Sequence, residues 1–326
     1  MAPLYLPVEF LATFDARHPE FFYTLLEHEG FQVFWPNSGQ AWTYSGRPPE
    51  KLLDRHSRNV VVYLNVLCDS LIKRDAALMN SQTAIAMIPA RYHSTRLPGK
   101  PIIEIQGKAL IEHVYRRVEQ ARLIDRIIVA TDDTRIVEVV ERFGGHVVMT
   151  RSDHQSGTDR LAEAAKELHP DVLIVNVQGD EPLIEPSVID RAITAARIRD
   201  AEMVSAMTRF SNSTDVQDPN RVKVVTDRNG FALYFSRSRI PSNGTCFLHL
   251  GLYVYRAGFL STFSKLERTP LETAERLEQL RVLEHGFRIR IIEVDSDSWG
   301  IDTAADLEKF KELTTKSTEA RMSGEG

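Results

Sequence analysis

The sequence predicts a mixed α/β fold, in which short buried strands alternate with amphipathic helices along most of the chain. Two observations carry this prediction. From residue 83 onward, short runs rich in Val and Ile alternate with segments whose apolar residues recur at helical spacing. After about residue 203, two mostly apolar runs at 222–226 and 231–235 flank an Asn-Gly pair that is typical of a tight hairpin turn. We therefore expect a parallel sheet with crossover helices, followed by a smaller antiparallel subregion.

The first half of this region alternates regularly between predicted strands and helices. The strand at 172–177 is almost entirely apolar, which is typical of a central strand buried on both faces. Gly144 and Gly145 are expected to end the helix that precedes the third strand, because glycine readily adopts the backbone conformation of a helix C-terminus. The predicted order is a strand at 84–88, a helix at 110–121, a strand at 126–131, a helix at 134–143, a strand at 146–150, a helix at 157–168 and the strand at 172–177.

The second half continues with the antiparallel subregion and two more helices. Gly286 ends one helix, and Asp302 or Thr303 is a suitable N-cap for the last one. Residues 314–326 lack apolar periodicity and are predicted to form a frayed tail. The predicted order is strands at 222–226, 231–235 and 250–256, a helix at 273–285, a strand at 288–294 and a helix at 303–313.

Residues 1–82 do not join this alternation. The segment is rich in Phe, Trp and Tyr, and Pro48-Pro49 interrupts it. Met79 directly precedes the first predicted strand, so one hypothesis takes Met79 as the physiological start; the alternative is a small added module. The predicted organisation is an N-terminal extension at 1–82, one α/β domain at 83–313 and a flexible tail at 314–326.

Composition excludes several classes of protein. The 326 residues carry 40 basic and 45 acidic side chains, a net charge of −5, so no general positive field would attract nucleic acid or an anionic membrane. The longest apolar stretch, 59–68, is well short of the roughly 18 residues that a membrane-spanning helix needs. Cys68 and Cys246 match no disulfide framework or zinc-ligand spacing. We expect a cytoplasmic protein without nucleic-acid partners or stable membrane insertion.

A basic loop follows the first predicted strand. Arg91, Arg96 and Lys100 fall within ten residues, and Gly99 permits close backbone approach. A loop at the carboxyl end of a strand is where open α/β sheets bind ligands, and these cations suit phosphate oxygens. A solvated basic turn is the alternative. Neither of the common glycine-rich phosphate-binding patterns occurs here, which disfavours P-loop and dinucleotide-binding readings.

Two further polar segments follow later strands. The run 151–160 is polar at nearly every position, and Ser156 or Thr158 could cap the helix that follows. Asp180 comes directly after the most buried strand, and Asp302 lies between a strand and a helix near the C-terminus. Each aspartate on its own could be a turn or capping residue.

These motifs resemble those of the 3-deoxy-manno-octulosonate (Kdo) cytidylyltransferase family, the CMP-Kdo synthetases, from about residue 83 to 313. The resemblance implies a Rossmann-like nucleotidyltransferase fold of the glycosyltransferase-A kind, with an antiparallel subregion for dimerisation and acceptor binding. It also implies a homodimer that uses CTP, Kdo and Mg²⁺ in lipopolysaccharide biosynthesis.

The resemblance assigns roles to individual positions of this sequence. The catalytic residues would be Arg96, Lys100 and Asp180, and the Mg²⁺ ligands Asp180 and Asp302. The residues around CTP would be Pro89, Ala90, Arg91, Arg96, Lys100, Gln155, Ser156, Gly157, Arg160 and Gln178. The residues around Kdo would be Lys223, Arg237, His249, Tyr253, Glu278 and Gln279.

Two departures from the family pattern stand out. The loop before His249 is short, and Leu248 takes the place of a basic residue, which affects how the acceptor site would close. Ala304 replaces the proline that usually follows the second metal ligand, which would loosen the start of the last helix slightly. Taken singly, His249, Tyr253 and Glu278 could equally be a core histidine, a packed aromatic and a solvated helix residue.

The reaction that the resemblance implies is CTP + Kdo → CMP-Kdo + pyrophosphate. A cytidylyltransferase for another acidic sugar, such as N-acylneuraminate or 8-amino-Kdo, is the nearest alternative. A non-catalytic CTP-binding regulator is an alternative from another class. A sugar-1-phosphate nucleotidyltransferase has less support, because its glycine-rich first loop is absent.

Overall fold

The computed structural model describes residues 83–93, 97–210, 215–296, 299–301 and 303–323, together with three short strands nearer the N-terminus. The chain divides into two compact units, Met1–Leu67 and Cys68–Gly326. In the first unit, β1 (Tyr5–Leu6) runs parallel to β2 (Gln32–Phe34), and β3 (Ala41–Thr43) pairs antiparallel with β2. Met79 lies outside the described residues, so both hypotheses for the N-terminal extension stay predictions.

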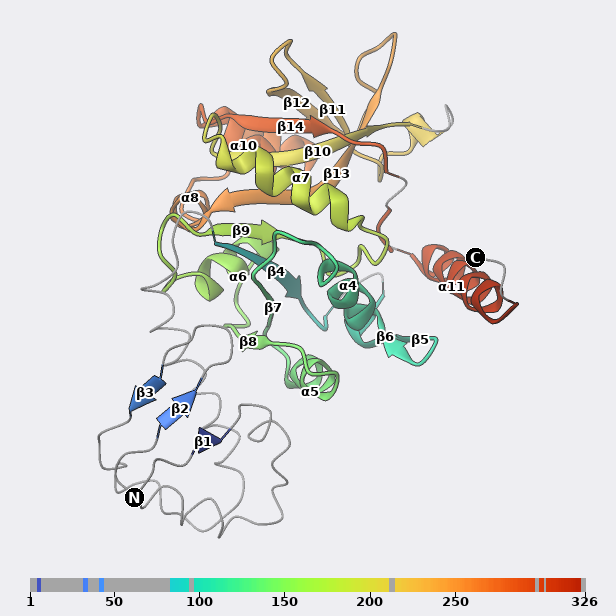
Figure 1. Ribbon diagram of the computed structural model, residues 1–326. Helices are drawn as coiled ribbons and strands as arrows, with labels where there is room; N and C mark the ends of the chain where they lie inside the picture. Colours follow the sequence, from blue (N-terminus) through green and yellow to red (C-terminus); the bar gives the residue numbers. More distant parts are fainter. Residues whose placement is uncertain are drawn as a thin grey trace. The chain divides into compact units, whose positions relative to one another are not determined.

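The predicted parallel sheet is confirmed in the second unit (Figure 1). Strands β9 (Leu173–Asn176), β4 (Ala84–Ala90), β7 (Arg126–Thr131) and β8 (Val147–Met149) lie side by side in that order, each parallel to the next. Because parallel strands share a direction, the loops that follow them all emerge at one edge of the sheet. This edge is called the carboxyl edge below.

The predicted antiparallel subregion is also confirmed, and one long strand connects it to the parallel half. β13 (Phe247–Arg256) pairs antiparallel with β9, with β10 (Met203–Arg209) and with β11 (Lys223–Thr226). β11 forms the expected hairpin with β12 (Ala232–Ser236), and β14 (Ile289–Glu293) runs parallel to β10. The first residues of β13 therefore reach the same carboxyl edge at which the parallel strands end.

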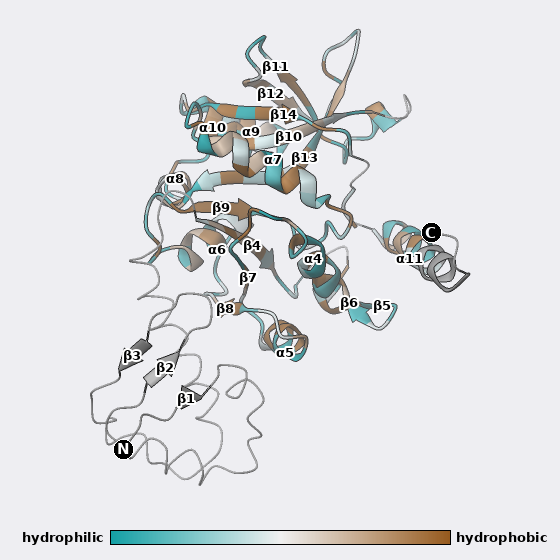
Figure 2. Cartoon of the chain, viewed as in Figure 1, coloured by the Kyte–Doolittle hydropathy of each residue, from teal (hydrophilic) through white to brown (hydrophobic). Residues whose placement is uncertain are grey.

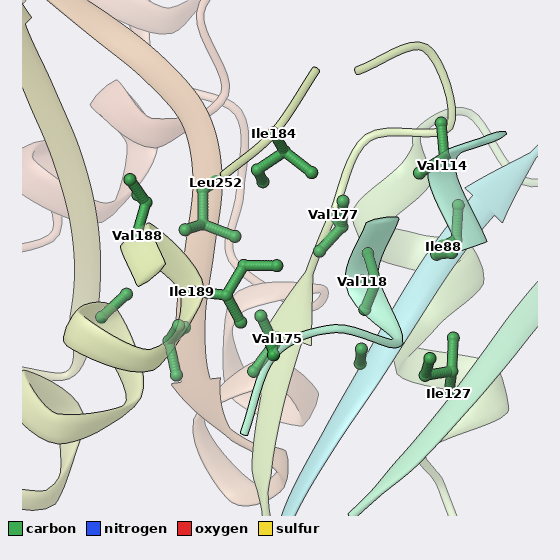
Figure 3. Close-up of a cluster of buried hydrophobic side chains, with 14 of the residues drawn as sticks. Ile88, Val114, Val118, Ile127, Val175, Val177, Ile184, Val188, Ile189 and Leu252 are labelled. Carbon is green, nitrogen blue, oxygen red and sulfur yellow. The ribbon is translucent and has the colours of Figure 1, made fainter. Parts of the chain in front are cut away.

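Helices cover both faces of the sheet, and the alternation along β4 shows why. Ala84, Ala86 and Ile88 pack into one core, whereas Ile85 and Met87 pack into the other, as successive strand residues must. The first core lies under α4 (Leu110–Val118), α5 (Thr134–Arg142) and α7 (Pro186–Arg197). The second lies under α6 (Gly157–Ala164), α8 (Ala257–Phe263) and α10 (Gln279–Glu284). Figure 2 shows the resulting hydrophobic strands, and Figure 3 shows part of the first core.

The single helix predicted at 273–285 is wrong. The segment forms two short helices, α9 (Pro270–Glu275) and α10, because Arg276 has left-handed backbone angles of φ 55° and ψ 47°. A Thr269/Glu272 capping box starts α9, and Thr-x-x-Glu is a pattern that could have located this start in the sequence. On either side of the break, Glu275 accepts a hydrogen bond from Ser236 Oγ on β12 at 2.7 Å, whereas Glu278 accepts one from Thr158 on α6.

The C-terminal helix is longer than expected. α11 spans Ala304–Ser323, ten residues beyond the predicted end at 313. Leu307 and Phe310 from α11 pack with Ile105, Leu110 and Ile301 into a third small core. The remaining short elements are η2 (Lys100–Ile102), β5 (Glu104–Ile105), β6 (Lys108–Ala109) and η3 (Asp215–Gln217).

A search of the described residues finds no helix that is both long and apolar enough to span a bilayer.

Candidate active site

The centre of the carboxyl edge is a contact between the first loop and the loop after β9. Lys100 Nζ donates to Asp180 Oδ2 at 2.6 Å and to the Ile301 carbonyl at 2.7 Å. Ile301 N in turn donates to the Asp180 carbonyl at 2.8 Å. Three segments far apart in the sequence therefore meet at one partly buried, charge-assisted hydrogen bond.

The backbone of the first loop is held in place by its glycine. Gly99 has a φ of 68°, and its N–H donates to the Tyr92 carbonyl at 2.9 Å. The Arg135 guanidinium lies 3.3 Å from the centroid of the Tyr92 ring, so α5 supports the loop from outside. Arg91 is exposed at the start of this loop, directly after Pro89 and Ala90 at the end of β4. Arg96 lies outside the described residues, and its predicted role is untested.

Small residues allow the loops to approach one another closely. A Cβ on Gly179 would lie 3.0 Å from the Pro89 carbonyl oxygen, so a side chain there would push β4 away. A Cβ on Gly157 would lie 3.3 Å from the Pro89 ring, so α6 begins directly against the end of β4. The first loop, the start of α6 and the Asp180 loop therefore border the same stretch of the sheet edge.

The polar run 151–160 contains residues with different roles. Ser156 is the N-cap of α6, since its Oγ accepts a hydrogen bond from Asp159 N at 3.1 Å. This confirms the capping function that the sequence allowed. Gln155 is exposed, and its amide donates to the Asp153 carbonyl at 3.0 Å. The predicted contact of Gln155, Ser156 and Gly157 with a nucleotide base stays a prediction.

Arg160, also predicted to lie near the base, is buried beneath this segment. It is 4% exposed, forms an ion pair with Asp132 at 3.1 Å and donates to the Thr150 hydroxyl. These contacts join the start of α6 to the ends of β7 and β8. In this position, Arg160 supports the segment 151–160 from the interior of the protein.

On the other side of the edge, a β-bulge brings His249 and Tyr253 together. The β10–β13 register shifts between Ser205 and Ala206, so two extra residues of β13 are accommodated there. The rings of His249 and Tyr253 lie 5.5 Å apart, whereas residues four apart in a regular strand are separated by about 13 Å. Gly251 lies in this bulge, where a Cβ would come within 2.7 Å of Glu181 Oε1.

His249 is neutral and has a defined hydrogen-bond partner. Burial lowers the pKa of His249 to about 3. Its Nε2 lies 2.8 Å from Ser205 Oγ, and Ser205 Oγ lies 2.8 Å from the Leu252 carbonyl. One arrangement satisfies all three groups: Ser205 donates to Leu252, and Nε2–H of His249 donates to Ser205. The sequence-based reasoning missed Ser205, because nothing in its local pattern distinguishes it from any other strand serine.

Lys223 and Arg237, both predicted to meet the acceptor, are held by backbone carbonyls in this structure. Lys223 Nζ donates to the carbonyls of Asp218, Arg221 and Arg237 at 2.9, 2.8 and 2.6 Å, and burial lowers its pKa. The Arg237 guanidinium donates to the carbonyls of Glu275 and Pro219 at 2.9 and 3.0 Å. Direct contact with a substrate would require either side chain to exchange one of these bonds, and both roles stay predictions.

Glu278 connects α10 to α6. Its Oε2 accepts a hydrogen bond from Thr158 Oγ1 at 2.6 Å. Burial raises the pKa of Glu278, and the hydroxyls of Thr158 and Ser156 oppose that shift only in part. Gln279 follows at the start of α10 and is 4% exposed. A buried ion pair supports this helix, since Arg281 donates two hydrogen bonds to Glu272 at 2.7 and 2.5 Å. The sequence reasoning missed Thr158 as a partner of Glu278, and it missed the Arg281–Glu272 pair.

The chemistry of Asp180 suits a hard cation. One of its oxygens accepts from Lys100, and no described residue donates to Oδ1. A carboxylate oxygen beside a basic loop is an appropriate ligand for Mg²⁺. Gln178 donates to Asn176 Oδ1 at 3.1 Å on the same loop. Asp302, the other predicted ligand, lies outside the described residues.

A cation-bearing loop, a carboxylate and a polar, capped helix start, all at the carboxyl edge of an α/β sheet, are the parts of a nucleotidyltransferase site. The family described as cytidylyltransferase matches residues 85–291 of this chain. Among solved structures, a 4-diphosphocytidyl-2C-methyl-D-erythritol synthase shares the fold at 17% identity, with a TM-score of 0.51.

Comparison with more similar proteins identifies the family within this class. A 3-deoxy-manno-octulosonate cytidylyltransferase from Geobacter metallireducens is 52% identical over 249 residues, covering 71% of this chain and 97% of the relative. One from Syntrophotalea carbinolica is 52% identical over 237 residues, covering 68% and 94%. A solved CMP:2-keto-3-deoxy-manno-octonic acid synthetase complexed with CTP superposes with a TM-score of 0.69 at 40% identity, covering 72% of this chain and 99% of the other. The chain belongs to the 3-deoxy-manno-octulosonate cytidylyltransferase family.

Proposed function

We propose that this chain transfers CMP from CTP to Kdo and releases pyrophosphate. The observation that carries the proposal is the 52% identity to cytidylyltransferases of this name, together with the contact of Lys100, Asp180 and Ile301 at the sheet edge. An oxygen of the Kdo anomeric hydroxyl attacks the α-phosphorus, a new P–O bond forms, and the bond to the β-phosphate oxygen breaks. The electron pair leaves with pyrophosphate, and the hydroxyl proton passes to solvent.

The nucleotide side of the site neutralises the triphosphate. We assign Lys100 and Arg91, and by family resemblance Arg96, to the triphosphate, and Lys100 stabilises the charge that develops on pyrophosphate. Gln155, Ser156 and Gly157 border the position of the cytosine. Because phosphoryl-type transfer needs little covalent help, positioning and charge neutralisation account for most of the catalysis.

Magnesium is the cation we propose for Asp180 and Asp302. Bound there, Mg²⁺ would supply phosphate bridging and a lower pKa for the attacking hydroxyl. Lys100 holds Asp180 Oδ2 in the present structure, and this hydrogen bond fixes the carboxylate at the mouth of the site.

The acceptor side binds Kdo with both neutral and charged groups. His249, Tyr253, Glu278 and Gln279 orient the sugar hydroxyls, while Arg237 and Lys223 meet its carboxylate. Since His249 is neutral, its part is that of a hydrogen-bonding group.

The proposal also covers the oligomeric state and the cellular location of the enzyme. Leu233 on β12, the last strand of the sheet, is 61% exposed, and an exposed apolar residue on an edge strand supports self-association into a homodimer. We place the enzyme in the cytoplasm, where CMP-Kdo would serve lipopolysaccharide biosynthesis.

The test is pyrophosphate release by the purified chain with Mg²⁺, measured for each of the four ribonucleoside triphosphates against Kdo, N-acetylneuraminate and 8-amino-Kdo. Turnover with CTP and Kdo above all other pairs is expected. Preference for another sugar acid would replace Kdo as the acceptor. CTP binding without turnover for any acceptor would instead indicate a regulator.

A further inference from the structure

The side chain of Glu278 has an unusual position between two helices that belong to different sides of the site. It occupies the N-cap position of α10, two residues after the backbone break at Arg276. Its side chain accepts a hydrogen bond from Thr158, 120 residues earlier in the chain, at 2.6 Å, and the Ser156 hydroxyl of the same turn also lowers its pKa. Thr158 lies in the first turn of α6 and is 5% exposed, so this hydroxyl is sequestered from water.

The second carboxylate oxygen, Oε1, does not help to orient the Glu278 side chain, so the hydrogen bond from Thr158 to Oε2 sets its orientation. Oε1 is buried and accepts no hydrogen bond within the described part of the chain. The nearest cation, Arg281 Nη2, lies 3.5 Å from Oε1 and already donates to Glu272 at 2.5 Å. Since buried carboxylate oxygens are costly to leave unpaired, loss of the Thr158 hydrogen bond would destabilise this position of Glu278.

The two ends of this hydrogen bond lie on opposite sides of the proposed reaction. Thr158 follows Gln155, Ser156 and Gly157 directly, in the same helical turn that Ser156 caps. Glu278 precedes Gln279. Burial raises the pKa of Tyr253 on β13, and the charge of Glu278 adds to that shift, so Glu278 lies near the acceptor side. A movement of the α6 turn or of the start of α10 is therefore transmitted to the other through the Thr158–Glu278 hydrogen bond.

We propose that Thr158 is a positioning residue whose hydroxyl, bonded to Glu278, couples acceptor binding to nucleotide binding across the site. The inference rests on the proposed function, because it takes the α6 turn to face the nucleotide and Glu278 to face the acceptor. An acceptor that fixes Glu278 also fixes Thr158 and the turn before it, so each substrate favours the arrangement that the other needs.

The test compares Thr158→Val, which removes the hydroxyl at nearly constant volume, with Thr158→Ser, which keeps it. Initial rates are measured over a grid of CTP and Kdo concentrations. For the natural protein, saturating Kdo is expected to lower the KM for CTP at least threefold. Thr158→Val is expected to abolish this dependence and to raise the KM for Kdo about tenfold, the loss typical of one hydrogen bond to a charged group, with kcat within about threefold. Thr158→Ser is expected to restore both.

Several outcomes would overturn the inference. They are a KM for CTP that does not depend on Kdo in the natural protein, unchanged kinetics in Thr158→Val, and equal losses in Thr158→Val and Thr158→Ser, which would indicate packing. If urea denaturation shows that Thr158→Val is not folded, Thr158→Ala provides the same comparison. A natural protein that releases no pyrophosphate from CTP and Kdo would overturn the proposed function and this inference with it; activity with unchanged variants would overturn the inference alone.

Discussion

The nucleotide side and the acceptor side of this site are built in different ways. On the nucleotide side, the functional groups stand on loops that directly follow parallel strands, as Lys100 follows β4 and Asp180 follows β9. On the acceptor side, His249 and Tyr253 lie within a strand, and Glu278 stands at a break between two helices. Loops at strand ends can change without disturbing the core, whereas the acceptor residues depend on the packing of buried neighbours. We therefore expect substitutions on the first side to affect chemistry, and substitutions on the second to affect stability and acceptor affinity together.

The largest expected effect is on the nucleotide side. Lys100→Met removes the cation that contacts Asp180 and would stabilise pyrophosphate, so kcat should fall about a thousandfold with little change in the urea midpoint. The kcat of Asp180→Asn should fall by a similar factor. Lys166→Met, which removes an exposed lysine after α6, is the matched control and should keep full activity. Near-normal pyrophosphate release by Lys100→Met would contradict the expectation that substitutions on the nucleotide side affect the chemistry.

The next effect concerns the buried ion pair behind the acceptor side. Arg281→Gln leaves Glu272 buried without its partner and should lower the free energy of unfolding by about 3 kcal/mol, measured by urea denaturation. The exposed pair between Lys311 and Glu308 is the control, since Lys311→Gln should change stability by less than about 0.5 kcal/mol. Equal effects of the two substitutions would show that burial does not increase the cost of removing one partner of the ion pair.

His249 adds a pH dependence that belongs to the acceptor side alone. Its folded pKa, about 3, is below its unfolded value of 6.5, so the unfolded chain binds more protons as pH falls. The contribution is neutral above pH 6.5 and destabilising below it, by about 1.4 kcal/mol per pH unit down to about pH 3. Between pH 6.5 and 5 the natural protein should therefore lose about 2 kcal/mol more than His249→Gln. Parallel stability curves for the two proteins would contradict a buried neutral histidine.

The smallest effect sharpens the comparison further. Ser205→Ala removes the hydroxyl that accepts from His249 Nε2, so the ring loses its fixed orientation. The KM for Kdo should rise about tenfold, while the KM for CTP, measured at saturating Kdo, stays the same. Ser261→Ala, on the exposed face of α8, serves as the control. A rise in the KM for CTP of similar size would mean that the two sides are not separately built.

The sequence predicted the nucleotide side better than the acceptor side for a physical reason. Period-2 and helical apolar patterns locate the strands and crossover helices, and a polar residue directly after a buried strand must emerge at the carboxyl edge. Lys100, Asp180 and the Ser156 cap follow from that rule. Ser205 and Arg281 carry no such local signal, because their importance comes from partners 44 and 9 residues away.

By itself, then, the sequence determined the α/β alternation, the antiparallel subregion, the basic first loop and the family to which the chain belongs. Only the tertiary structure decided how the acceptor side is assembled. The left-handed backbone at Arg276 divides a predicted helix, and the bulge beside Ser205 brings His249 to Tyr253. Both features are chosen by packing between segments distant in the chain, since local propensity favours the unbroken helix and the regular strand.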